Sequence, residues 1–192
     1  MQAQECSKLD PRIRRTRHLL QDSLRHLLEE KELKEISVQD ITERATLNRA
    51  TFYAHYTDKF ALLEEMIRVN FLQLLEKRNV RFDGTCPSAL RAVILAVCDF
   101  LVDFQPSIST RQHQFGPFLQ TTVIDQVRIV LLDGFQRHPV NMRASAEVIA
   151  ATTSWAIFGA AREWASDSKR VPPEDFVSLA LELIGPILAT VA

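Results

Sequence analysis

The chain of 192 residues is poor in cysteine and glycine and carries almost no net charge. Its three cysteines, Cys6, Cys86 and Cys98, are odd in number and widely spaced, which favours reduced thiols over a disulfide framework or a zinc site. The net charge of −1 excludes attraction of the whole molecule to nucleic acid, so any DNA affinity must come from a local basic surface. With only 5 glycines, the chain shows no glycine-rich phosphate loop.

Long apolar runs are missing as well. No stretch reaches the roughly 18 apolar residues that a membrane-spanning helix needs, and no signal-peptide core follows the first basic residues. We therefore expect a cytoplasmic protein that has neither a secretion signal nor a membrane span. No nucleophile–base pair or metal-ligand spacing stands out, so we expect no cofactor and no metal, and a helical enzyme or carrier is the weaker alternative.

What the sequence does contain is helical periodicity. Asp10 is a suitable N-cap and Pro11 a suitable first residue for a helix whose apolar stripe includes Leu20, Leu24 and Leu28. Gly185–Pro186 should kink or end the last helix near its last turn. The remaining helices are predicted at 37–45, 49–55, 59–78, 88–105, 118–137 and 141–164, with the last beginning at Pro172–Pro173.

Two of these helices are short and flank a tight turn at Thr46–Leu47. Ser37 is the expected N-cap of the first, with Asp40 three residues later approximating a capping box, and Asn48 is the expected N-cap of the second. This is the layout of a helix-turn-helix, whose second helix enters the DNA major groove. Four arginines crowd the start of the preceding helix and could either be a solvated end or contact phosphates: Arg12, Arg14, Arg15 and Arg17.

Residues 45–63, ATLNRATFYAHYTDKFALL, resemble the signature of the TetR family of bacterial transcriptional regulators. The best matches are Thr51-Phe52-Tyr53, His55-Tyr56 and Lys59, and the similarity extends over about residues 12–66. Three departures stand out. Thr46 occupies a turn position, usually glycine in the family, that favours positive φ; Ala50 replaces a common glycine or proline; and Phe60-Ala61 replaces two acidic residues.

The resemblance implies an all-α fold, in which an N-terminal three-helix helix-turn-helix DNA-binding domain is joined by a long helix to a C-terminal helical ligand-binding and dimerisation domain. The corresponding boundaries are 1–58 for the DNA-binding domain, 59–79 for the connecting helix and 80–192 for the effector-binding and dimerisation domain. It also implies a homodimer formed through the last two helices. Two copies are expected on physical grounds too, because one head covers only half of a palindromic double-stranded DNA operator.

The resemblance also assigns DNA contacts position by position. Arg49 would reach base edges and Ala50 a thymine methyl group. Phosphates would be bound by Ser37, Thr51, Tyr53, His55 and Lys59, with further backbone or minor-groove contacts from Arg14, Arg15 and Arg17. Structural alternatives exist for three of these: Tyr53 could be packing, His55 could satisfy helix carbonyls, and Lys59 could be an ordinary surface lysine.

A small-molecule effector is expected to bind within residues 88–164, and the valine-rich segment around Val123 and Val127 favours a hydrophobic or amphipathic one. The candidate residues are Phe100, Phe104, His113, Phe118, Thr122, Trp155, Phe158 and Arg162, with Asp99, Asp103 and Trp164 considered beside them. An aromatic stripe of this kind is also the pattern of a plain core. The predicted function is a dimeric repressor that its effector releases from the operator; a ligand-independent or partner-controlled regulator, or an activator, remains the alternative.

Overall fold

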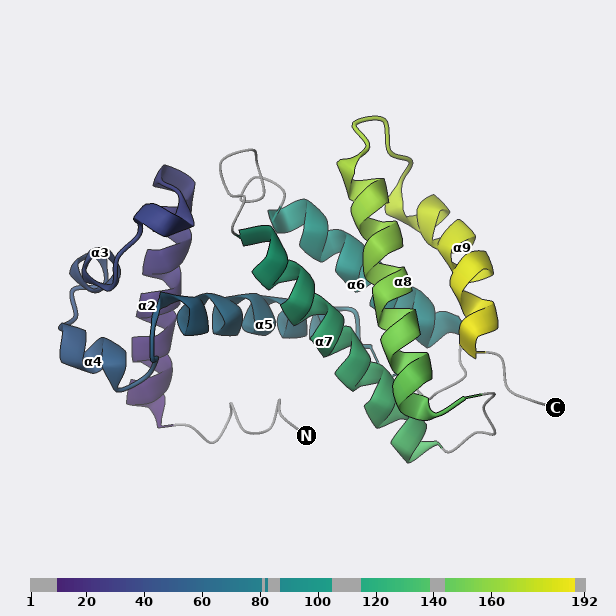
Figure 1. Cartoon of the computed structure of the whole chain (residues 1–192), viewed down its shortest axis with the longest axis horizontal. Coiled ribbons are helices and arrows are strands. Elements are labelled where there is room, and N and C mark those ends of the chain that lie inside the picture. The colour runs from purple at the N-terminus through teal and green to yellow at the C-terminus, as the bar shows by residue number, and fades with distance from the viewer. Residues whose placement is uncertain (1–9, 81, 83–86, 105–114, 139–143, 189–192) are drawn as a thin grey trace. The chain divides into compact units, whose positions relative to one another are not determined.

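The computed structural model describes residues 10–80, 82, 87–104, 115–138 and 144–188, and all regular structure within these residues is helical (Figure 1). The predicted all-α class, with a helix-turn-helix followed by a helical remainder, is therefore confirmed. The elements are α2 (Pro11–Glu30), η1 (Leu33–Glu35), α3 (Val38–Arg44), α4 (Arg49–Tyr53), α5 (Lys59–Lys77), α6 (Pro87–Phe104), α7 (Phe115–Arg137), α8 (Ala146–Ser166), α9 (Pro173–Ile184) and η3 (Gly185–Leu188).

Contacts divide the described chain into two compact units. The first contains residues up to 69 together with 115–119, and the second contains the described residues of 70–105 and 120–188. Helix α5 therefore contributes to both units. The boundaries expected from the sequence, at residues 58 and 80, stay predictions.

Side-chain caps fix the ends of the helices in the first unit. Asp10 Oδ1 accepts a hydrogen bond of 2.8 Å from the Arg12 amide at the start of α2. Ser37 and Asp40 form the expected capping box on α3. Asp58 Oδ1 accepts from two amides in the first turn of α5, those of Phe60 at 2.8 Å and Ala61 at 2.9 Å. These caps satisfy amides that have no partner within their own helix.

The turn between α3 and α4 requires a left-handed residue. Thr46 has φ 55°, as its position in the motif predicts. The amide of Leu47 donates to the carbonyl of Thr42 at 2.9 Å, and that of Thr46 donates to Glu43 at 3.1 Å. This pair of bonds is a Schellman motif, which usually has glycine at the left-handed position because a side chain there is strained.

In the second unit α6 is central and packs against both α8 and α9 (Figure 1). Val93 and Val97 are fully buried on α6, and Phe100 meets Phe71 of α5 edge to face at 5.5 Å between ring centroids. Gly134 on α7 lets the backbone of Phe82 approach closely. A Cβ at position 134 would lie only 2.6 Å from the Phe82 carbonyl oxygen. No helix of the described residues is long and apolar enough to cross a bilayer.

Two helix starts differ from the sequence expectation by three residues or more. Helix α8 begins at Ala146 instead of Asn141, because the Ser145 hydroxyl caps it by accepting from the Val148 amide at 3.4 Å. Helix α7 begins at residue 115, three residues early, since a proline within the first turn of a helix costs no hydrogen bond. The last helix ends at Ile184, directly before Gly185–Pro186, as predicted.

Replacing Thr46 with glycine should stabilise the protein. Left-handed backbone costs an L-residue about 1–2 kcal/mol, and glycine avoids this cost. Glycine is also more flexible in the unfolded chain, which cancels about 0.5–1 kcal/mol of that gain. We expect Thr46→Gly to raise the free energy of unfolding by about 0.5 kcal/mol in urea titrations. The matched variant Thr57→Gly, at an exposed residue without positive φ, should be neutral or destabilising; equal effects of the two changes would contradict the strain.

Candidate nucleic-acid interface

Helix α4 is five residues long and is held in place by its buried side chains. A helix of this length is unstable alone in water. Phe52 is fully buried and Tyr56, just after the helix, is nearly so, with 5.9 Å between their ring centroids. Asn48 caps the helix, since its Oδ1 accepts from the amide and the hydroxyl of Thr51 at 2.7 and 2.9 Å. Tertiary packing and this cap therefore fix the direction in which α4 presents its other face.

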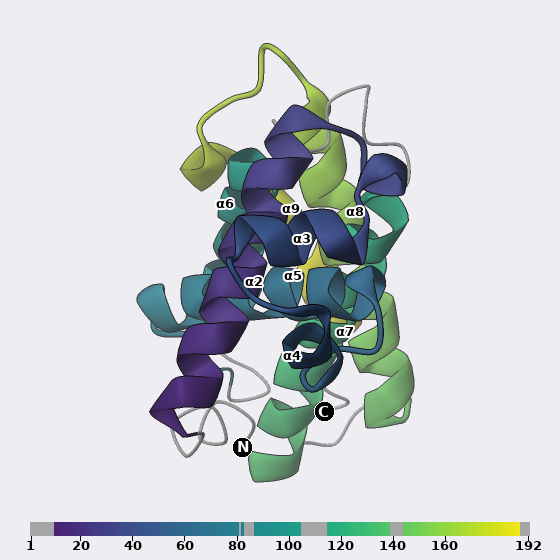
Figure 2. The same ribbon diagram turned by 90° about the vertical axis from the view of Figure 1, so that its left-hand side faces the viewer.

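The opposite face of α4 is open to solvent. Arg49, Ala50 and Tyr53 are all exposed, and Figure 2 shows α4 and α3 at the front of the first unit. The Tyr53 ring, 51% exposed, meets Phe52 edge to face, and its hydroxyl lies 3.5 Å from Nη2 of Arg49. Arg49 is thus oriented along the helix while most of its five N–H donors stay available. A guanidinium so placed can bind the O6 and N7 atoms of guanine.

Two of the predicted phosphate donors already donate their hydroxyl hydrogens within the caps of α3 and α4. The Ser37 hydroxyl donates to Asp40 Oδ2 at 2.6 Å and accepts from the Asp40 amide at 3.1 Å. The Ser37 hydroxyl, the Ser37 amide, which donates to the same Oδ2 at 2.6 Å, and the Lys31 ammonium hold the pKa of the Asp40 carboxyl well below its usual range. The Thr51 hydroxyl donates to Asn48, as described above. Each hydroxyl has one hydrogen, so a phosphate contact by either side chain would have to replace its cap bond.

Four further phosphate contacts predicted from the sequence, His55 and three arginines of α2, differ in charge and in exposure. Burial, and secondarily the charge of Arg17, lowers the pKa of His55, so at pH 7 the ring is mainly neutral and offers an N–H donor instead of a positive charge. Arg17 turns inward: its guanidinium lies 5.9 Å from the centre of the Tyr56 ring and 3.7 Å from the Glu65 carboxylate. Arg14 and Arg15 are exposed and remain available for phosphates.

Lys59 has a structural role that sequence reasoning missed. Its ammonium group donates to the backbone carbonyls of Leu33 at 2.8 Å, Lys34 at 3.3 Å and Ile36 at 2.7 Å. These three bonds use all three of its donors and tie the start of α5 to the segment before α3. Burial lowers the pKa of the Lys59 ammonium. A cation in the first turn of a helix opposes the helix dipole. The position of Lys59 therefore indicated a special role, but the sequence could not show that the role is to bind these carbonyls.

The effector residues predicted from the sequence are not among those that line the groove described below, and the effector site stays a prediction. Phe100 belongs to the core contact with Phe71, Phe118 stacks on Phe60 within the first unit at 5.2 Å, and Trp155 is 57% exposed on α8 and so does not face the interior. Thr122 and Phe158 are buried in the second unit, and exposed Arg162 lies 3.4 Å from the Gln120 side-chain oxygen. The side chain of Phe104 and the whole of His113 lie outside the described residues.

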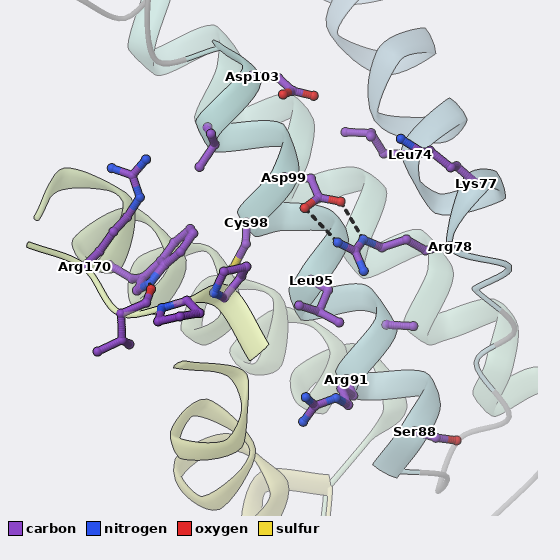
Figure 3. Close-up of a pocket in the computed structure, with 16 residues that line it drawn as sticks. Leu74, Lys77, Arg78, Ser88, Arg91, Leu95, Cys98, Asp99, Asp103 and Arg170 are labelled. Atoms are coloured by element: carbon purple, nitrogen blue, oxygen red, sulfur yellow. Dashed lines mark hydrogen bonds and ion pairs between the residues drawn. The ribbon is translucent and has the colours of Figure 1, made fainter. Parts of the chain in front are cut away.

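A groove of about 1020 Å³ occupies another part of the second unit (Figure 3). It is lined by α5, α6, Trp164 and residues 170–173, which connect α8 to α9. Asp99, Asp103 and Trp164, considered in the sequence analysis, lie on it. The cations of the groove were not predicted from the sequence, because only the fold brings the end of α5 and the 170–173 segment to the same side of α6. These cations are Lys77, Arg78, Arg91 and Arg170.

Comparison with known proteins links the first unit to DNA-binding regulators. Residues 21–66 match the family of bacterial regulatory proteins described as the tetR family. A stretch of 74 residues is 37% identical to the uncharacterized HTH-type transcriptional regulator YxbF of Bacillus subtilis (strain 168). This match covers 38% of the present chain and only 20% of YxbF. The family match thus lies in the helix-turn-helix part of the chain.

Solved structures extend the likeness to nearly the whole chain. A TetR transcriptional regulator from Streptococcus agalactiae 2603V aligns with a TM-score of 0.57 and 20% identity, covering 90% of this chain and 95% of that one. The transcriptional regulator FadR from Bacillus subtilis, solved in complex with stearoyl-CoA, aligns with a TM-score of 0.55 and 13% identity, covering 91% and 99%. At these identities the likeness shows the fold.

Changing Lys59 to methionine should destabilise the first unit, because three carbonyls lose a charged donor. We expect the free energy of unfolding to fall by about 1–3 kcal/mol, measured by urea titration with circular dichroism. Lys34→Met is the matched control: this nearby lysine is exposed, and its ammonium group pairs with the Glu32 carboxylate at 2.8 Å. The structural role would be contradicted if Lys59→Met were as stable as the control but bound DNA more weakly and with less salt dependence. That result would support the phosphate contact expected from the motif.

Proposed function

We propose that this TetR-family transcriptional regulator is a dimeric repressor that leaves its operator when a small molecule binds to its helical body. The relatives named above are transcriptional regulators, not enzymes. One observation carries the proposal: the exposed face of α4, with Arg49, Ala50 and Tyr53, is held outward by the buried Phe52 and Tyr56. A short, rigid, outward helix is what reading the major groove requires.

The DNA contacts divide into base readout and backbone binding. Arg49 reads a guanine and Ala50 packs on a thymine methyl group. Tyr53, Arg14 and Arg15, all exposed, bind phosphates, to which neutral His55 adds an N–H donor. The roles of Ser37, Thr51, Arg17 and Lys59 lie mainly in shaping this surface, since their donors or charges are engaged within the protein.

Dimerisation is proposed to use α8 and α9. Both helices carry large apolar side chains on exposed positions: Val148 and Trp155 on α8, and Leu179 and Leu183, 68% exposed, on α9. Thr152 and Gly159 continue the α8 stripe at helical spacing and would let a partner helix approach closely. Exposed apolar surface of this kind is typical of protein–protein interfaces. Trp155 thus has a more plausible place at a subunit interface than in an effector site.

Effector control would act by shifting populations. FadR, whose fold is similar, was solved with stearoyl-CoA, which supports a ligand site in the helical body of this chain. The ligand must bind better to a form whose heads do not fit the operator, because equal affinity for both forms would release nothing. A ligand-independent or partner-controlled regulator would lack this coupling. An activator would bind the same DNA, and the position of the operator relative to the promoter separates it from a repressor.

The DNA surface can be tested with two matched arginine variants. Genomic fragments retained by the purified full chain would first define the operator. Arg49→Ala should then relax the choice at one base pair in each half-site, at a cost of about 1–3 kcal/mol for the preferred base. Arg15→Ala should weaken binding to all sequences about equally and lower the salt slope by about 1. Fluorescence anisotropy over a salt series measures both.

Unfolding curves would establish that both variants keep the wild-type fold. The reverse pattern, with Arg15 controlling base choice and Arg49 only the salt slope, would place the recognition surface elsewhere. Failure of the full chain to select any fragment at moderate salt would contradict the DNA-binding function itself.

A further inference from the structure

The groove of the second unit is a mixed site, with apolar walls and cations around them. Helix α6 supplies one side of it, α5 contributes Leu74 and Lys77, and the connection between α8 and α9 contributes residues 170–173 (Figure 3). Its volume of about 1020 Å³ is at the upper end of the range for small-molecule sites. All of its lining residues belong to one compact unit, so its shape does not depend on how the two units are placed.

The apolar wall is centred on an immobilised indole. Trp164 Nε1 donates to the Val171 carbonyl at 2.9 Å, and the ring stacks on Phe176 at 5.4 Å. The Arg170 guanidinium lies 5.5 Å from the centre of the Trp164 ring. Leu95 of α6 lines the groove beside it, and because Trp164 is 8% and Leu95 9% exposed, each presents only an edge to the groove. Since Trp164 is already held by these contacts, a ligand packing here would not have to pay the cost of ordering it.

One cation of the groove is neutralised within the protein. Arg78 donates two hydrogen bonds to the Asp99 carboxylate, with Nε 2.6 Å from Oδ2 and Nη2 2.8 Å from Oδ1 (Figure 3). These hydrogen bonds raise the pKa of Arg78, so its guanidinium stays protonated. The pair therefore shapes the floor of the groove and leaves little net charge for a ligand.

Three further cations lack such a partner. Arg91 donates to the Ser178 hydroxyl at 3.4 Å and the Glu174 carbonyl at 3.2 Å, and Arg170 donates to the Ala165 carbonyl at 3.4 Å, all uncharged acceptors. In the part of the chain that the structure describes, neither these arginines nor Lys77 forms an ion pair with a carboxylate. Asp103 is the other carboxylate of the lining. The lining residues thus include four cations and two carboxylates, and the nearby Glu174, whose charge acts on Arg78 and Cys98, reduces the excess of positive charge without removing it.

We propose that this groove binds an amphipathic carboxylic acid, whose apolar body packs on Trp164 and Leu95 and whose carboxylate pairs with Lys77 or Arg170. The assignment rests on the proposed effector control and names the site and the ligand class for it. Separated apolar and cationic surfaces select against neutral amphiphiles, because the cations would stay unpaired beneath the bound molecule. They also select against small inorganic anions, which bury no apolar area.

Four probes and two double variants test the proposal with the full-length chain. The probes are decanoate and 2-naphthoate, with decanamide and 2-naphthamide as uncharged counterparts of the same shape. Lys77→Gln/Arg170→Gln removes two charges from the groove. Arg128→Gln/Lys169→Gln removes two charges from exposed residues outside it, one of them adjacent to Arg170 in sequence. Isothermal titration calorimetry without DNA measures binding, and thermal melting verifies that each variant is folded.

We expect at least one acid to bind the wild-type chain saturably below about 1 mM and its amide about tenfold more weakly. The groove variant should lose about tenfold in affinity for the acid, and the surface variant should match the wild type. Binding should also change the fluorescence of Trp164 in a Trp155→Phe background. Equal affinity for acid and amide, an unaffected groove variant, or no saturable binding of either acid would each overturn the proposal.

Operator release is measured separately, by fluorescence anisotropy with the same probes. Acids that bind through Lys77 and Arg170 but leave operator affinity unchanged would uphold the groove as a carboxylate site and contradict effector control by this class. Acids that release the operator equally from wild type and groove variant would uphold effector control and refute the groove. The two failures are therefore distinguishable.

Discussion

The orientation of a five-residue helix depends on two buried aromatic side chains. Phe52 and Tyr56 bury the inner side of α4, and without them a helix this short would not persist in water. Arg49 and Tyr53 face solvent because they lie on the opposite side of the same helix. If α4 reads DNA as proposed, its specificity depends on the hydrophobic packing beneath this surface as much as on the residues that the surface exposes.

Much of the polar chemistry around α4 serves architecture. Ser37 and Asn48 cap the two short helices, and Lys59 joins three carbonyls before α3 to the start of α5. Thr46 keeps a left-handed turn despite its side chain. The family resemblance assigns two of these residues, Ser37 and Lys59, to phosphate binding. In the structure they hold the few exposed residues, chiefly Arg49, in position.

Local rules predicted the fold well, because caps and turns are decided by neighbours in sequence. Asp10, Ser37 and Asn48 cap as expected, and Gly185–Pro186 stops α9. The candidate sites were harder to predict, since they depend on which distant residues meet. Nothing local shows that Lys59 reaches the carbonyl of Leu33, that Trp155 faces outward, or that Arg170 and Lys77 line one groove.

The most direct test of the account is a hydroxyl-radical footprint of the full-length protein on its selected operator. If two outward copies of α4 read the DNA, protection should appear as two symmetric segments on one face, centred about 10 base pairs or a multiple of that spacing apart. The Phe52→Ala protein, which loses the anchor of α4, should leave no ordered footprint at concentrations that saturate with wild type. One asymmetric protected segment, or an unchanged footprint for Phe52→Ala, would contradict it.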